Sequence, residues 1–285
     1  MSDHITPVQQ ESRKFLPSEA FAAKARVRGM DAYHAICQRA LGDPDQFWGS
    51  IARVFHWYKP WKSVLEWKQP DAKWFAGGAT NICYNCVDRQ VNSGKRNKAA
   101  FITELESGEV QTLTYGQLLR EVCQLAGALA TMDIKAGDRV GIYMPNIAQA
   151  AIAMLACARI GAVHTVVFGG FSAQALADRL NDCTARALIT ADGLRRRGKT
   201  VDLKSVADEA VAKAPSVKNV VVWRNTGNPV TMQPQRDAWW HEAVKGQSGF
   251  IEPYHADSEH PLFLLYTSGT TGKPRGILHT TAGYM

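Results

Sequence analysis

The chain has 285 residues, with 33 lysines and arginines against 26 aspartates and glutamates, which gives a formal net charge of +7. Hydrophobic residues make up 46% of it and charged residues 21%, proportions of a globular protein that exclude a disordered or collagen-like chain. No apolar run approaches the roughly 18 residues of a membrane helix. The first 26 residues are polar and lack the apolar core of a signal peptide. We therefore expect a cytoplasmic protein with no membrane partner.

The six cysteines are too few for a disulfide framework in a chain of this length. Cys83 and Cys86 form the one C-x-x-C pair, whereas a zinc ribbon needs two such pairs. A thioredoxin-type motif needs a strand before the pair, and the stretch 81–91 lacks that context. The sequence therefore favours reduced thiols over a metal or redox site, and we expect no metal ligand among these cysteines.

Five of the eight tryptophans lie between Trp48 and Trp74, in a basic stretch interrupted by proline. Such a cluster can be a stacking platform for nucleic acid, or an irregular segment whose aromatic rings anchor it to a larger body. The rings have no regular spacing that would follow a strand of bases, and acidic residues are scattered among the basic ones. We therefore favour anchoring and expect no nucleic-acid partner.

The first clearly periodic element begins at Thr114, which forms a capping-box pattern with Gln117. Apolar residues follow at helical spacing as far as Leu129. Beyond this helix, short apolar runs alternate with helical patterns. We expect strands at 138–144, 162–168, 186–191, 219–223 and 262–266, separated by helices at 147–160, 173–180 and 203–214. Ser172 is expected to cap the second of these helices.

Continuous apolar strands separated by helices predict an α/β fold with a mainly parallel sheet and flanking helices. In such sheets, ligands bind beyond the carboxyl ends of the strands. Functional residues are therefore expected in the loops that follow Met144, Phe168, Ala191 and Tyr266.

The loop after Tyr266 has the composition of a polyphosphate site. Its sequence, YTSGTTGKPRG, combines glycines that allow close backbone approach with hydroxyl groups and two cations. It is not a Walker A loop, because Thr267 replaces the first glycine and Pro274 follows the lysine. The candidate phosphate ligands are Thr267, Ser268, Gly269, Thr270, Thr271, Gly272, Lys273, Arg275 and Gly276.

This loop is similar to the phosphate loop of the adenylate-forming enzymes, which include acyl-CoA synthetases, luciferases and peptide-synthetase adenylation domains. Nearly the whole chain from about Asp31 also resembles acetyl-CoA synthetases (AMP-forming acetate–CoA ligases). The stretches that carry the resemblance are WYKPWKSVLEW, KWFAGGATNICYNCVDR, IYMPNIAQAAIAMLACARIGAVHTVVFGGFS and ILHTTAGY. Propionyl-CoA synthetases are similar as far as the loop and stay an alternative. His279, Thr280 and Thr281 fit the acetate branch better.

The resemblance also implies a CoA site in a basic segment. Between residues 195 and 204 there are five cations and one aspartate, a run that could equally be a solvated charged face. In acetyl-CoA synthetases the corresponding loop contacts the 3′-phosphate of CoA, and a second stretch lines the same site. The residues implied are Arg196, Arg197, Gly198 and Lys199 in the first stretch, and Phe168, Gly169 and Gly170 in the second.

The implied substrates are ATP, carried with Mg²⁺, acetate and CoA. In the family, the adenine and acetate pockets, the magnesium ligand and the catalytic lysine lie downstream of the phosphate loop. We therefore expect the truncated N-terminal part of the large adenylate-forming domain, with no certain catalytic residue and no acetyl-CoA formation by this chain alone. A non-catalytic fragment that binds CoA or phosphate is the alternative. The expected division is a flexible arm at 1–30, an acetyl-CoA synthetase-type N-terminal segment at 31–88 and an incomplete ligase domain at 89–285.

Overall fold

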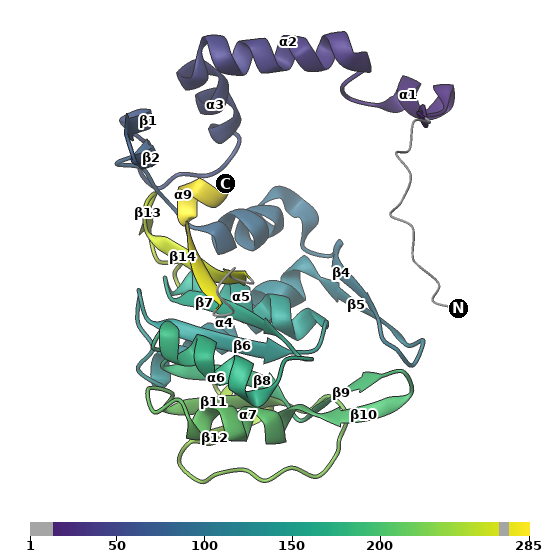
Figure 1. Cartoon of the computed structure of the whole chain (residues 1–285), viewed down its shortest axis with the longest axis vertical. Helices are drawn as coiled ribbons and strands as arrows, with labels where there is room; N and C mark the ends of the chain where they lie inside the picture. The colour runs from purple at the N-terminus through teal and green to yellow at the C-terminus, as the bar shows by residue number, and fades with distance from the viewer. Residues whose placement is uncertain (1–13, 268–273) are drawn as a thin grey trace, which may run out of the picture. The chain divides into compact units, whose positions relative to one another are not determined.

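The computed structural model describes residues 14–267 and 274–285, which divide into two compact units between Ile51 and Ala52. The first unit contains helices α1 (Glu19–Lys24) and α2 (Gly29–Gly42) and most of α3 (Pro44–Ala52) (Figure 1). Helix α1 lies within the segment expected to be an arm. The boundary falls inside the expected segment 31–88, so the division into domains at residues 30 and 88 stays a prediction.

The second unit is organised around a seven-stranded sheet. Every neighbouring pair of strands in it is parallel except the last, which is antiparallel. The sequence prediction of a mainly parallel sheet with flanking helices is therefore confirmed. In spatial order the strands are β12 (Asp237–Trp239), β11 (Asn219–Trp223), β8 (Ala187–Ala191), β6 (Arg139–Met144), β7 (Val163–Phe168), β14 (Pro261–Thr267) and β15 (Arg275–Thr280).

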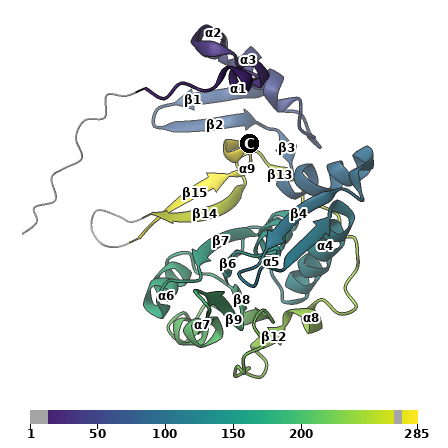
Figure 2. The same cartoon turned by 90° about the vertical axis from the view of Figure 1, so that its right-hand side faces the viewer.

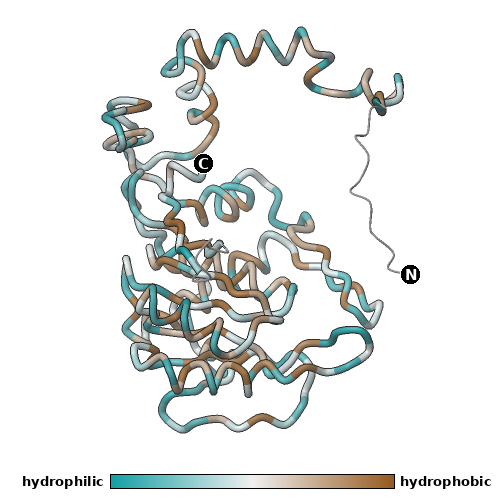
Figure 3. The backbone as a smooth tube through the Cα atoms, viewed as in Figure 1, coloured by the Kyte–Doolittle hydropathy of each residue, from teal (hydrophilic) through white to brown (hydrophobic). Residues whose placement is uncertain are grey.

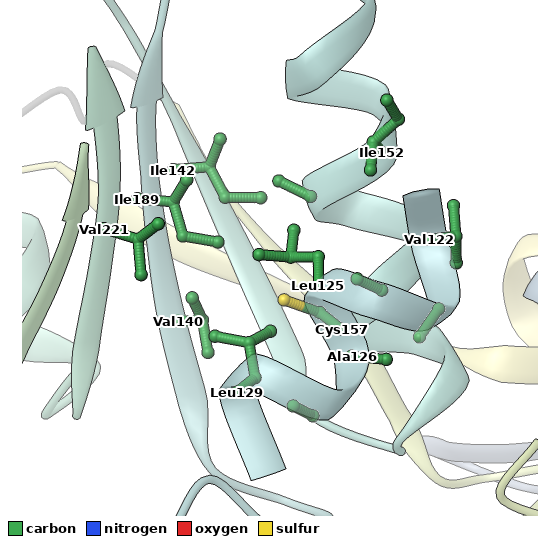
Figure 4. Close-up of a cluster of buried hydrophobic side chains, with 14 of the residues drawn as sticks. Val122, Leu125, Ala126, Leu129, Val140, Ile142, Ile152, Cys157, Ile189 and Val221 are labelled. Atoms are coloured by element: carbon green, nitrogen blue, oxygen red, sulfur yellow. The ribbon is translucent and has the colours of Figure 1, made fainter. Parts of the chain in front are cut away.

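Helices cover both faces of this sheet (Figure 2). Helices α4 (Tyr115–Thr131), α5 (Ala148–Arg159) and the short α8 (Trp240–Ala243) pack on one face, and α6 (Ala173–Asp182) and α7 (Leu203–Ala212) on the other. Figure 4 shows the first of the two cores, where side chains of α4 and α5 meet the central strands. Its fully buried members include Leu125, Leu129, Ile142, Ile152 and Ile189.

Side-chain caps fix the beginnings of two helices as the sequence predicts. The hydroxyl of Thr114 accepts a hydrogen bond from the Gln117 amide at 3.3 Å, and the Gln117 side chain accepts one from the Thr114 amide at 2.8 Å. At α6, the Ser172 hydroxyl accepts from the Ala175 amide. Each cap satisfies amide groups that the first helical turn leaves unpaired.

The tryptophan-rich stretch is more regular than expected. It contains the antiparallel hairpin β1 (Ser63–Lys68) and β2 (Asp71–Ala76), and the prolines lie outside both strands. The ring centroids of Trp57 and Trp61 lie 5.5 and 5.2 Å, respectively, from that of Phe75, in a cluster that also contains Ala282, so these rings join the stretch to a distant part of the chain. The prediction of an irregular segment was wrong because Pro70 occupies the turn between the strands instead of breaking one.

Smaller elements complete the second unit. The antiparallel pairs are β3 (Ala79–Thr80) with β13 (Ala256–Asp257), and β4 (Ala99–Glu104) with β5 (Val110–Thr114). Two π-helical turns, η1 (Tyr84–Asp88) and η2 (Val91–Lys95), precede β4, and α9 (Thr281–Tyr284) follows β15. The carboxyl ends of β6, β7, β8 and β11 lie at one edge of the sheet, because these strands are parallel.

Candidate functional site

The basic segment forms a hairpin. Strand β9 (Gly193–Arg196) pairs with β10 (Lys199–Asp202), and Arg196 lies opposite Lys199 in the register. The two connecting residues, Arg197 and Gly198, have φ values of 52° and 73°, as in the type I′ turns that join tightly paired strands. The side chains of the turn and the first β10 residue are exposed, and the tip is hydrophilic in Figure 3. The hairpin therefore presents its cations to solvent on a defined scaffold.

Lys204 does not belong to this exposed group. Its side chain is 1% exposed, and its ammonium lies 2.7 Å from a carboxylate oxygen of Asp208 and 2.8 Å from one of Asp237. It also donates a hydrogen bond to the carbonyl of Thr231 at 2.9 Å. The basic run counted in the sequence therefore includes one cation that is neutralised inside the protein and unable to bind a ligand.

The turn after β7 lies against this hairpin. A Cβ atom added to Gly169 would lie 2.9 Å from Leu194 Cδ2, and one added to Gly170 would lie 3.1 Å from Arg196 Nη1. The absence of side chains at these two glycines lets the turn approach β9 closely. Phe168 precedes them with its side chain 73% exposed. The structure thus brings together the two segments that the family resemblance assigns to one site.

The phosphate-loop candidates are divided between two strands and the segment that joins them. Thr267 ends β14 and pairs with Arg275, the first residue of the antiparallel strand β15, and Gly276 pairs with Tyr266. Arg275 and Gly276 therefore lie on a strand and not in the loop. Ser268, Gly269, Thr270, Thr271, Gly272 and Lys273 lie outside the described residues.

Gly276 has a packing role that the sequence did not reveal. A Cβ atom there would lie 3.1 Å from the Tyr266 ring, whose hydroxyl donates a hydrogen bond to Asp182 at 2.6 Å. Burial, together with this hydrogen bond, raises the pKa of Tyr266. The tyrosine therefore stays neutral and holds the end of β14 against α6.

Sequence reasoning missed an acidic group beside the basic hairpin. A cleft of about 410 Å³ is lined by Arg195, by Glu104 at the end of β4 and by Glu106 and Glu109 in the β4–β5 connection. Glu106 accepts a hydrogen bond from the backbone amide of Gly198 at 3.1 Å. The two hairpins extend to the same side of the molecule (Figure 1). The sequence signal for this acidic group was three glutamates within six residues. Only the folded structure shows that they lie beside the basic hairpin.

A separate cavity of about 800 Å³ shares no lining residue with the basic hairpin or the glycine turn. Its walls are mostly apolar and include Met154, Leu155 and Phe263. His164 also faces it, and its Nδ1 atom is buried without a hydrogen-bond partner. Burial lowers the pKa of this imidazole to about 4, so it is neutral near pH 7.

Among the described residues there is no group of three or more histidine, cysteine, aspartate or glutamate side chains arranged to hold a metal ion. Cys83 and Cys86 are both free thiols. Cys83 is fully buried, and burial raises its pKa to about 12. Its thiolate, the form that binds metals and reacts, is therefore disfavoured.

Comparisons with known proteins place this geometry in a family. The family model described as "AMP-binding enzyme" matches residues 87–285, which is more than half of the chain. The chain belongs to the AMP-binding enzyme family. A second model, "Acetyl-coenzyme A synthetase N-terminus", matches residues 33–86 of this AMP-binding enzyme.

Two curated relatives are both named "Acetyl-coenzyme A synthetase". The one from Chlorobaculum tepidum is 52% identical over 284 residues, and the one from Deinococcus radiodurans is 52% identical over 285 residues. Each match covers 100% of this AMP-binding enzyme but only 43% and 44% of the relative, respectively. The chain thus spans less than half the length of these relatives.

A solved structure supports the same family assignment. "Acetoacetyl-CoA Synthetase from Streptomyces lividans" superposes with a TM-score of 0.82 at 28% sequence identity, covering 94% of this chain and 43% of that one. The α/β fold is therefore that of an acyl-CoA synthetase. No helix in the described part of this AMP-binding enzyme has both the length and the apolar character needed to cross a membrane.

Proposed function

We propose that the chain provides the CoA-binding and ATP-phosphate-binding part of an AMP-forming acetate–CoA ligase. In the first step of this reaction, acetate attacks the α-phosphorus of Mg·ATP and gives acetyl-AMP and pyrophosphate. In the second step, the CoA thiol attacks the acyl carbon and gives acetyl-CoA and AMP. Catalysis of such transfers is largely positioning and charge stabilisation, the tasks for which these two segments are suited.

The observation that carries the proposal is the contact between the basic hairpin and the Phe168–Gly170 turn at the carboxyl edge of the sheet. Arg196 and Lys199 lie on paired strands, so one anionic group of CoA, its 3′-phosphate, can meet both cations. The names of the two relatives, at 52% identity, favour acetate over propionate as the acid. The cytoplasmic location and the lack of a nucleic-acid partner stay predictions.

The phosphate loop has a separate proposed task. Thr267, Ser268, Thr270 and Thr271 would donate hydrogen bonds to the β- and γ-phosphates, and Lys273 would offset the charge of the departing pyrophosphate. Glycines at 269 and 272 would let the backbone approach these oxygens. Magnesium would enter with ATP, bound to its phosphate oxygens.

The two half-reactions test these assignments separately. We expect a fusion of this chain to the remaining part of the Chlorobaculum tepidum relative to form AMP and acetyl-CoA from acetate, ATP and CoA. The double variant Arg196→Ala/Lys199→Ala should raise KM for CoA but preserve acetate-dependent ATP–pyrophosphate exchange. Lys273→Ala should slow this exchange and, as a result, the formation of acetyl-CoA. A fusion that folds but forms no AMP with acetate overturns the ligase proposal.

Assays of the chain alone distinguish a catalytic role from a binding role. We expect it to bind CoA without forming acetyl-CoA, which is the behaviour of a binding fragment. Acetyl-CoA formed by the purified 285-residue chain would show that the residues needed for turnover are present in it. No binding of CoA would exclude the binding role.

A further inference from the structure

Asp192 lies where the segments that support the basic hairpin meet. It follows β8 directly, precedes Gly193 at the start of β9 and is fully buried. Its backbone amide donates to the carbonyl of Trp223 at the end of β11, at 2.9 Å. Its carbonyl accepts from the amides of Leu203 and Lys204 at the start of α7, at 3.2 and 3.3 Å. The backbone of one residue therefore joins β8, β11 and α7 at the base of the hairpin.

The carboxylate of Asp192 adds a second set of contacts. Its Oδ1 atom accepts from the backbone amides of Gly193, Asn225 and Thr226 at 2.7, 2.8 and 3.0 Å. Its Oδ2 atom accepts from the amide of Gly227 at 2.8 Å, and the Thr226 hydroxyl donates to Oδ1 at 3.2 Å. These donors lie in β9 and in the turn after β11. An uncharged side chain could not accept from all of them, since an amide has only one acceptor atom.

The turn after β11 also clamps the first residue of β9. The Asn225 side chain donates to the carbonyl of Gly193 at 2.9 Å. A Cβ atom on Gly193 would lie 2.6 Å from Thr226 Oγ1, 2.7 Å from Asn228 Oδ1 and 2.9 Å from the carbonyl oxygen of Val201 on β10. The base of the hairpin is thus held from both sides by tight contacts, while its tip is exposed.

We propose that Asp192 is a positioning residue for phosphate recognition. Its carboxylate locks the base of β9–β10 to the turn at 225–227, so that Arg196 and Lys199 are held ready for the same phosphate. The inference rests on the proposed CoA-binding role of the hairpin. Asp192 is fully buried and acts on the ligand only through the hairpin. Loss of its charge leaves buried amides unsatisfied at the hairpin base and lets the hairpin, with both cations, move away from the turn at 225–227.

The test compares CoA with 3′-dephospho-CoA as calorimetric probes of the full 285-residue chain. We expect the wild-type chain to bind CoA about tenfold more tightly than the dephosphorylated form. In Asp192→Asn this preference should fall below about threefold. The affinity for 3′-dephospho-CoA should change less than the affinity for CoA. The matched control is Asp138→Asn, which also neutralises a largely buried carboxylate but lies directly before β6; it should keep the wild-type preference.

A milder variant and a second readout cover the case in which Asp192→Asn does not fold. Asn225→Ala removes only the side-chain bond to Gly193, and its preference should lie between wild type and Asp192→Asn. Amide hydrogen exchange should also accelerate at residues 193–202 in either variant, but not in Asp138→Asn.

The outcomes separate the two proposals. Equal wild-type affinities for the two probes, with faster exchange at the hairpin in the variants, contradict the CoA role but preserve the anchoring role. A wild-type preference that Asp192→Asn or Asn225→Ala leaves intact overturns the positioning role.

Discussion

Arg159 at the end of α5 and Asp88 at the end of η1 form a buried ion pair with two parallel hydrogen bonds, of 2.8 and 3.0 Å. The Arg159 side chain is fully buried, and its Nε also donates to the carbonyl of Ile251 at 2.6 Å. Burial, the largest single influence, lowers the pKa of the guanidinium, but the hydrogen bonds to Asp88 and the charge interactions with Asp88, Cys83 and Cys123 together outweigh it, and the pKa is raised. The pair and the bond to Ile251 therefore join three distant segments of the chain.

Asp88→Asn should destabilise the protein strongly, because it leaves the Arg159 charge buried without its partner. We expect a loss of about 3–5 kcal/mol in the free energy of unfolding, measured by urea denaturation. Glu209→Gln is the control, since it makes the same carboxylate-to-amide change in an exposed pair with Lys213. That change should cost under about 1 kcal/mol. Similar losses in the two variants would contradict the structural role of the buried pair.

His164 should make stability depend on pH in the acidic range. Its pKa is lowered from 6.5 to about 4 by burial, so the unfolded chain takes up this proton at a higher pH than the folded chain does. The neutral imidazole therefore contributes about 3 kcal/mol to the free energy of unfolding, fully above about pH 6.5. This contribution is lost as the pH falls towards 4.

Replacement of this imidazole isolates its effect. We expect the free energy of unfolding, measured by urea denaturation, to fall between neutral pH and about pH 4.5 by about 2 kcal/mol less for His164→Phe than for the wild type. His241→Phe, at an exposed imidazole, should follow the wild type. If His164→Phe loses as much stability on acidification as the wild type, the buried histidine does not carry this pH dependence.

The bond between Glu106 and Gly198 places a negative charge beside the cations of the basic hairpin. Glu106→Gln should tighten CoA binding about two- to fivefold, because a phosphate would then meet less repulsion. Glu109→Gln removes the same charge from the same connection without touching Gly198, and it should have a smaller effect. Weaker CoA binding by Glu106→Gln in calorimetric titrations would show instead that Glu106 supports the hairpin.

Much of the sheet was predictable from local patterns. The apolar runs at 138–144, 162–168, 186–191 and 219–223 each became a parallel strand, with ends within one residue of those expected. The capping signatures at Thr114 and Ser172 mark helix starts, because they depend on residues three positions apart. Such patterns predict structure well because the interactions form between neighbouring residues and do not depend on distant parts of the chain.

The missed features depend on contacts between distant residues. The sequence counts Lys204 with its neighbours, but its ammonium is buried and paired with Asp208 on the same helix and with Asp237 on the distant strand β12. Arg196 and Lys199 pair on two strands because Arg197 and Gly198 adopt a tight turn, and a run of charges hides that pattern. The role of Asp192 depends on a turn more than thirty residues away in sequence.

The most direct test of the CoA role is a titration of the wild-type chain and of Arg196→Ala/Lys199→Ala with CoA and 3′-dephospho-CoA. The account predicts that the wild type binds CoA about tenfold more tightly than the dephosphorylated form and that the double variant binds both with similar affinity. A wild-type chain that binds the two molecules equally, or a double variant that keeps the preference, would contradict the assignment of the basic hairpin to the CoA phosphate.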